Sequence, residues 1–162
     1  MATYPPLPEP VEITYETEPC FGACPVYRVT VNNLGQPGTF EGKRFTAVEG
    51  TRSFPMTYRQ FSAFYAALSD ARAADSKAYE RGGANCQMMA TDHPGVSVTF
   101  REGQTAPWTF RFYYGCRDRQ NAKLAEGLRR APEALPIADF IGSQQVRPRR
   151  KGEPGLDAVT EK

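Results

Sequence analysis

Cys20-Phe21-Gly22-Ala23-Cys24-Pro25-Val26-Tyr27 is the stretch around which the chain is organised. It places two cysteines, a glycine and a proline between two segments in which apolar and polar residues alternate. Glycine adopts backbone angles that other residues avoid, and proline lacks the amide donor that a central strand needs. The stretch therefore predicts a turn between two strands, and its cysteines predict either a covalent closure of that turn or a chemical role.

Alternation of apolar and polar residues predicts strands on both sides of this turn. Apolar residues at every second position predict one strand over residues 11–17 and another over 27–31. Residues 32–38 are rich in turn formers, and residues 39–45 resume an extended pattern. The three segments predict an antiparallel meander, which we expect residues 50–55 to end.

A helix is predicted after the meander by a capping box, Thr57-Tyr58-Arg59-Gln60. Phe61, Phe64, Tyr65 and Leu68 follow at helical spacing, and we expect this aromatic stripe to pack on the sheet. Residues 71–94 then form the longest irregular stretch, which a disulfide through Cys86 would hold in place.

The second half of the chain predicts a hairpin and another helix. Residues 96–100 and 108–114 alternate as two strands around a short turn. Asp118 is placed to cap a helix that ends before Pro132, and residues 136–141 are expected to close over one end of the core.

These elements predict an α+β domain. We expect an antiparallel sheet of about five strands with two helices packed on one face, in the chain order βββαββα. The expected boundaries are a Pro-rich linker at residues 1–10, a single disulfide-stabilised domain at 11–142, and a disordered basic tail at 143–162.

Composition limits the partners. The net charge of +2 gives no reason to expect a nucleic-acid partner, and the basic cluster Arg147, Arg149, Arg150 and Lys151 lies among Pro and Gly as a solvated tail would. The longest apolar runs are only a few residues, so we expect no membrane span. We expect a monomer without a cofactor.

The four cysteines admit three pairings, a free-thiol state and a metal state. We favour the pairs Cys20 with Cys24 and Cys86 with Cys116, because the first two are close in sequence and the second two flank the predicted hairpin.

The alternative is a redox or zinc site that uses Cys20 and Cys24. Against redox chemistry, Cys-x-x-x-Cys differs from the Cys-x-x-Cys of thioredoxin-like enzymes, and no helix start is predicted beside it. We expect no metal site, since His93 is the sole histidine and the cysteine pairs are not spaced as zinc ligands.

The face of the sheet away from the helices is the candidate binding surface. Arg28, Arg111 and Tyr113 are predicted to lie on it. Arginine beside tyrosine suits anionic or sugar-like ligands and protein hot spots. No residue is assigned a catalytic role, because no nucleophile lies in a recognisable motif.

Cys-Phe-Gly-Ala-Cys-Pro-Val-Tyr at residues 20–27 also resembles a bacterial family of unknown function with a Cys-Phe-Gly-x-Cys-Pro-x-Tyr signature. The resemblance extends loosely over residues 11–141 and includes Ala90-Thr91-Asp92-His93-Pro94. Many members are exported proteins or lipoproteins, so the resemblance implies a periplasmic or other extracytoplasmic location. The N-terminus has no signal-peptide pattern, which leaves a cytoplasmic location or a signal replaced by Met1 as the alternatives.

Together these observations predict an exported, non-enzymatic binding module stabilised by disulfides. Its expected partner is a protein, a peptide or a component of the cell envelope. The alternative function is that of a thiol-disulfide or zinc-binding protein that uses Cys20 and Cys24.

Overall fold

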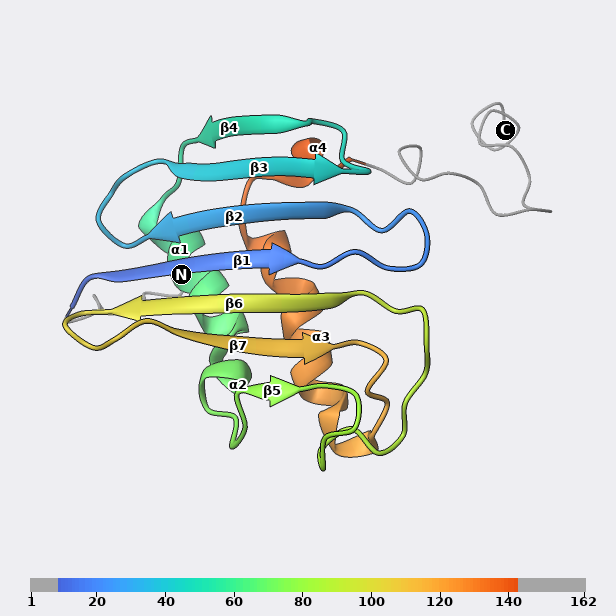
Figure 1. Ribbon diagram of the computed structural model, residues 1–162. Coiled ribbons are helices and arrows are strands. Elements are labelled where there is room, and N and C mark those ends of the chain that lie inside the picture. Colours follow the sequence, from blue (N-terminus) through green and yellow to red (C-terminus); the bar gives the residue numbers. More distant parts are fainter. Residues whose placement is uncertain (1–8, 143–162) are drawn as a thin grey trace, which may run out of the picture.

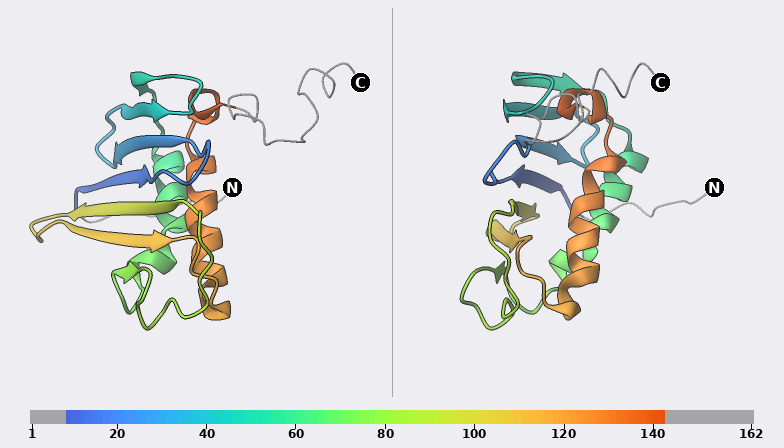
Figure 2. Two further views of the ribbon diagram at one scale, coloured as in Figure 1. Left: turned by 45° about the vertical axis from the view of Figure 1, so that its right-hand side comes forward. Right: turned by 90° about the vertical axis from the view of Figure 1, so that its right-hand side faces the viewer.

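The computed structural model describes residues 9–142 as a sheet of seven strands with helices on one face (Figure 1). A view along the sheet shows the strands and the helices as two layers (Figure 2). The strands are β1 (Val11–Thr17), β2 (Val26–Asn32), β3 (Gly38–Arg44), β4 (Gly50–Phe54), β5 (Ala78–Tyr79), β6 (Gly95–Glu102) and β7 (Trp108–Tyr113). The helices are α1 (Tyr58–Ala67), α2 (Ser69–Arg72), α3 (Ala122–Arg130) and α4 (Ala138–Ile141), with 3₁₀ turns η1 (Arg119–Asn121) and η2 (Ala131–Ala134).

The α+β class is confirmed, but the predicted sheet was too simple. The strand order is β4-β3-β2-β1-β6-β7-β5, and β5 pairs parallel with β7, so the sheet is mixed where an antiparallel sheet of about five strands was expected. The prediction missed β4 and β5. The four α-helices also exceed the two expected, because α2 and α4 are single turns of four residues that leave little periodicity to detect.

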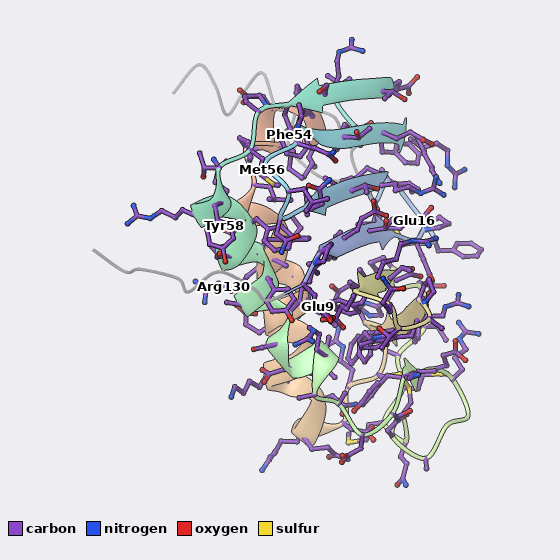
Figure 3. All side chains as sticks on the ribbon, turned by 90° about the vertical axis from the view of Figure 1, so that its left-hand side faces the viewer. Glu9, Glu16, Phe54, Met56, Tyr58 and Arg130 are labelled. Carbon is purple, nitrogen blue, oxygen red and sulfur yellow. A yellow bond between two sulfur atoms is a disulfide. The ribbon has the colours of Figure 1, made fainter. Side chains whose placement is uncertain are left out.

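The predicted alternation of residues on the long strands is confirmed. On β1, Ile13 and Tyr15 are buried under the helices, whereas Glu16 lies on the open face, as Figure 3 shows. Phe61 and Phe64 on α1 are fully buried against the sheet, so the aromatic stripe is core. Burial of each such side chain stabilises the fold by about 1.5–3 kcal/mol.

The capping box of α1 forms as predicted. The Thr57 hydroxyl accepts a hydrogen bond from the backbone N–H of Gln60 at 3.1 Å, and the Gln60 side-chain oxygen accepts from the backbone N–H of Thr57 at 2.9 Å. The cap predicted at Asp118 is wrong. Its side chain makes no capping bond to the 3₁₀ turn that follows, because its carboxylate is bonded to the backbone of the loop before β6.

Residues 136–141 close one end of the core, as expected. The ring centroid of Phe140 on α4 lies 5.3 Å from that of Phe40 on β3, and the backbone N–H of Ala47 donates to the carbonyl of Ile141. The predicted basic tail at 143–162 and most of the predicted linker, residues 1–8, lie outside the described residues. Within residues 9–142, no helix has the length and apolarity needed to cross a membrane.

Candidate functional site

A disulfide between Cys20 and Cys24 closes the loop that joins β1 to β2. The Cα atoms of the two cysteines are 5.7 Å apart. Thr17 fixes the base of the loop, because its hydroxyl donates to the carbonyl of Pro25 at 2.8 Å and accepts from the backbone N–H of Tyr27 at 3.0 Å. The loop is therefore fastened at its base and across its middle.

Phe21 is the exposed side chain of this closed loop. It is 90% exposed, the largest value among the exposed large hydrophobic residues of the described chain. An aromatic side chain at that exposure adds little to the core, although a fully buried one would stabilise the fold by about 1.5–3 kcal/mol. The sequence did not reveal this exposure, because hydrophobicity alone predicts burial.

A second disulfide, between Cys86 and Cys116, fastens the loop before β6 to the chain after β7. Both cysteines are buried in the hydrophobic core. These bonds join the pairs that the sequence favours. Met89 forms an isolated β-bridge with Cys116, which ties the loop to the end of β7 by its backbone as well.

The Asp118 carboxylate supports the same loop. It accepts hydrogen bonds from the backbone N–H groups of Gln87, at 3.0 Å, and Met88. These two bonds hold the pKa of Asp118 below its ordinary value, because they favour the charged carboxylate. The loop so held presents Met88 at 66% exposure and Met89 at 43%.

Both disulfide-held loops lie at one end of the sheet, which we call the disulfide end. It comprises residues 18–25, between β1 and β2, and residues 86–94, before β6 (Figure 1). The backbone N–H of Glu18 donates to the carbonyl of Gly95 at 2.9 Å and so joins the bases of the two loops. Each loop exposes a large apolar side chain, and each is fixed by a bridge.

Arg28 lies on the open sheet face, where the sequence placed it. Its guanidinium lies 3.3 Å from a carboxylate oxygen of Glu16 and 3.9 Å from one of Glu41. Burial by itself would raise the pKa of Glu16, but hydrogen bonds from Lys43 and Arg28 outweigh it and hold that pKa below its ordinary value. Glu16 therefore remains a charged partner that neutralises Arg28.

Arg111 and Tyr113 are also engaged by their neighbours. Arg111 lies 3.1 Å from a carboxylate oxygen of Glu18 and 3.7 Å from one of Glu80. The Tyr113 hydroxyl donates to the carbonyl of Ala90 at 2.8 Å. The open face thus satisfies its own charges and presents no unpaired arginine at these positions.

The strand order separates Arg28 from Arg111. Both residues lie in one cross-strand row that runs over β2, β1, β6 and β7. Glu16 and Ser97 occupy the two positions between them. Three strand spacings of about 4.8 Å place the two backbones about 14 Å apart. The structure therefore does not bring the predicted binding residues together as one small-molecule site.

A row of threonines crosses the same face beside the charged row. Register places the following hydroxyl residues opposite one another on successive strands: Thr39, Thr30, Thr14, Thr99 and Thr109. The hydroxyl oxygens of Thr99 and Thr109 are 2.8 Å apart, within hydrogen-bond distance. The centre of the open face is consequently polar, uncharged and internally bonded.

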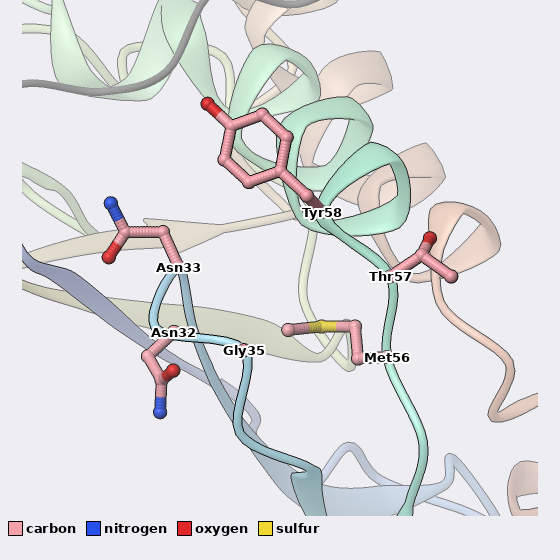
Figure 4. A pocket seen from close by; sticks show the side chains of 6 residues that line it. All are labelled: Asn32, Asn33, Gly35, Met56, Thr57 and Tyr58. Atoms are coloured by element: carbon pink, nitrogen blue, oxygen red, sulfur yellow. The ribbon is translucent and has the colours of Figure 1, made fainter.

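A hollow of about 270 Å³ opens at the opposite end of the sheet, beside the start of α1 (Figure 4). Its polar groups already serve the fold. Asn33 accepts from the backbone N–H of Val11 at 2.8 Å and donates to the carbonyl of Glu9 at 3.0 Å, and Thr57 caps α1. We therefore assign no ligand to this hollow.

The arrangement of the cysteines and of His93 in the described residues gives little support to a redox or zinc site. All four cysteines are in disulfides, and Cys20 and Cys24 lie in the loop between strands β1 and β2. In residues 9–142, no group of three or more histidine, cysteine or acidic side chains is placed to hold a metal ion. His93 instead lies with its Nε2 atom 3.3 Å from Nη2 of Arg117.

The fold and its two bridges define a small α+β domain stabilised by disulfides. Residues 11–132 match the family described as Domain of unknown function (DUF6438), and the chain belongs to this family. No curated protein matches the sequence, and no solved structure matches the fold.

Proposed function

We propose that this domain is a non-enzymatic binding module of an oxidising, extracytoplasmic compartment, and that it recognises an apolar segment of a protein or peptide at the disulfide end. The observation that carries the proposal is Phe21, 90% exposed within the loop that Cys20 and Cys24 close. The bridges support the location, because disulfides persist in oxidising compartments and are rare in a reducing cytosol.

A fixed loop with an exposed aromatic side chain suits protein recognition. Aromatic residues and methionine are enriched at the centres of interfaces, where a few side chains supply most of the affinity. Binding also costs less conformational entropy when the contacting loop is already ordered, and the bridge and Thr17 order this one. Phe21 is therefore presented in the way that a hot-spot residue requires.

The second loop adds exposed apolar side chains at the same end of the sheet. Met88 and Met89 are exposed on a loop whose backbone is fixed by Asp118 and by Cys116. Methionine is flexible and polarisable, so it adapts to different apolar partners. We infer that Phe21 is the anchor and that the methionines broaden the apolar contact around it.

The test uses peptides selected from a random-sequence phage library against the disulfide-bonded protein, with affinities measured by calorimetry. Phe21→Ser is expected to weaken the selected peptides at least tenfold, or about 1.4 kcal/mol, because it removes the anchor. The matched control is Leu34→Ser, which changes another exposed apolar residue in the turn between β2 and β3, at the far end of the sheet.

The control decides the outcome. Loss of affinity in Phe21→Ser with retention in Leu34→Ser supports the proposed site. Equal affinities of the wild type and Phe21→Ser, or an equal loss in both variants, would contradict it.

A further inference from the structure

A second hollow lies beside the disulfide end, between the chain after β7, the turn η1 and the helix α3. Its volume is about 350 Å³. Its lining contains three arginines, Arg117, Arg119 and Arg129, and two acidic residues, Asp118 and Glu126. The arginines come from three consecutive pieces of the fold.

The arginines of this hollow differ from those of the sheet face in having no carboxylate partner. Within residues 9–142, no ion pair involves Arg117, Arg119 or Arg129. Arg28 and Arg111, in contrast, each lie beside two glutamates. These three arginines therefore have no carboxylate of the described residues within ion-pair distance.

The acidic side chains that line the hollow are occupied elsewhere. Asp118 is held by the backbone amides of Gln87 and Met88. Glu126 lies 3.6 Å from the guanidinium of Arg130. Neither carboxylate forms an ion pair with the three arginines, which outnumber the two acidic residues of the lining.

Contacts with the core fix the walls of the hollow. The Arg129 guanidinium lies over the ring of Tyr114, 4.6 Å from its centroid, and Tyr114 is only 8% exposed. Buried Asn121 donates to the carbonyl of Asn85 at 2.8 Å, which ties η1 to the loop before β6. Two sides of the site are thus ordered before any ligand enters.

We propose that this hollow binds the phosphate group of a small phosphorylated molecule. The arginine guanidinium is planar, permanently charged and shaped to donate two hydrogen bonds at once to a phosphate. Three arginines without an ion-pair partner match the two negative charges and several acceptor oxygens of a phosphate monoester. The volume admits the phosphate with a small attached group, and the Tyr114 ring under Arg129 supplies an apolar wall. This site does not depend on the proposed peptide site.

The first experiment titrates the complete disulfide-bonded protein with inorganic phosphate and follows backbone amides by NMR, with sodium chloride at equal ionic strength as reference. Saturable shifts at Arg117, Arg119 and Asn121, with a Kd below about 10 mM, are expected from phosphate and not from chloride. Arg119→Gln should weaken phosphate binding at least tenfold. Arg111→Gln, which removes a paired arginine of the sheet face, should leave the Kd unchanged within twofold.

Two results would overturn the site. One is shifts that chloride reproduces, which would reduce the arginines to a solvated charge. The other is equal behaviour of Arg119→Gln and Arg111→Gln.

A second comparison separates a soluble ligand from a membrane lipid. Glycerol 3-phosphate is expected to bind at least as tightly as inorganic phosphate and to compete with it. Binding only to vesicles of phosphatidylglycerol, with no response to either soluble probe, would contradict the small-molecule site and assign the arginines to a membrane surface.

Discussion

The two loops of the disulfide end are each closed by a disulfide, but the two disulfides differ in sequence separation, burial and expected contribution to stability. Cys20 and Cys24 are separated by 4 positions in sequence, whereas Cys86 and Cys116 are separated by 30 and are buried in the core. The loop-entropy relation gives about 2 kcal/mol for the short closure and about 3.7 kcal/mol for the long one. The long bridge mainly stabilises the fold, and the short one mainly shapes an exposed surface.

Removing the long bridge tests this comparison with the largest expected effect. Cys86→Ala combined with Cys116→Ala should lower the free energy of unfolding by about 4 kcal/mol, because it frees a long loop and empties part of the core. Chemical denaturation followed by circular dichroism measures the change. A loss no larger than that caused by removing the short bridge would refute the division of roles.

Removing the short bridge should cost about half as much. Cys20→Ala combined with Cys24→Ala is expected to lower the free energy of unfolding by about 2 kcal/mol, and amide exchange should quicken in residues 18–25 alone. The same series tests the thiol alternative. Thiol-disulfide exchange activity that disappears in this variant would count against a purely structural bridge.

Acidification should loosen the long-bridged loop before it unfolds the protein. Because the folded-state pKa of Asp118 lies below its ordinary value, its carboxylate stabilises the loop above the unfolded-state pKa, and this stability is lost as the pH falls through the folded-state pKa. The protection factors of the Gln87 and Met88 amides, which compare each exchange rate with the intrinsic rate at the same pH, should therefore fall in acid. In Asp118→Asn, exchange at these two amides should already be fast at neutral pH, and an unchanged pH profile would show that the carboxylate is not the cause.

Phe21→Ser should have the smallest effect on stability. A side chain that is 90% exposed contributes little to the core, so the free energy of unfolding should change by less than about 0.5 kcal/mol. The same substitution is expected to have the largest effect on peptide binding. A marked loss of stability would show that Phe21 serves the fold.

The sequence was sufficient to locate those strands and helices that pack one side on the core. Alternation located the long strands, and the Thr57 capping box located the start of α1. Strand β4 escaped prediction because it lies at the edge of the sheet and buries only Phe54, so it has no alternating pattern. Strand β5 has two residues and exists through its pairing with β7, which local sequence does not encode.

The candidate sites depended on information that only the register provides. The sequence placed Arg28 and Arg111 on one face, but the order of strands determined that glutamates would lie beside each of them. Asp118 was predicted as a helix cap from its position before a helix. Its carboxylate instead accepts a hydrogen bond from the backbone of Gln87, in a loop distant in sequence. Phe21 is hydrophobic and yet exposed, in the loop that Cys20 and Cys24 close.

The place of β1 in the centre of the sheet also determines the order in which the domain can be completed. The strands from β1 to β4 follow one another in the chain and pair with short connections, but the other edge of β1 pairs with β6, where Tyr15 meets Val98. During synthesis this edge stays open until the later strand arrives. An open strand edge is a template for pairing with other chains. Until β6 is made, this edge of β1 is therefore available to pair with other chains, and the bond between Cys86 and Cys116 can form only after that.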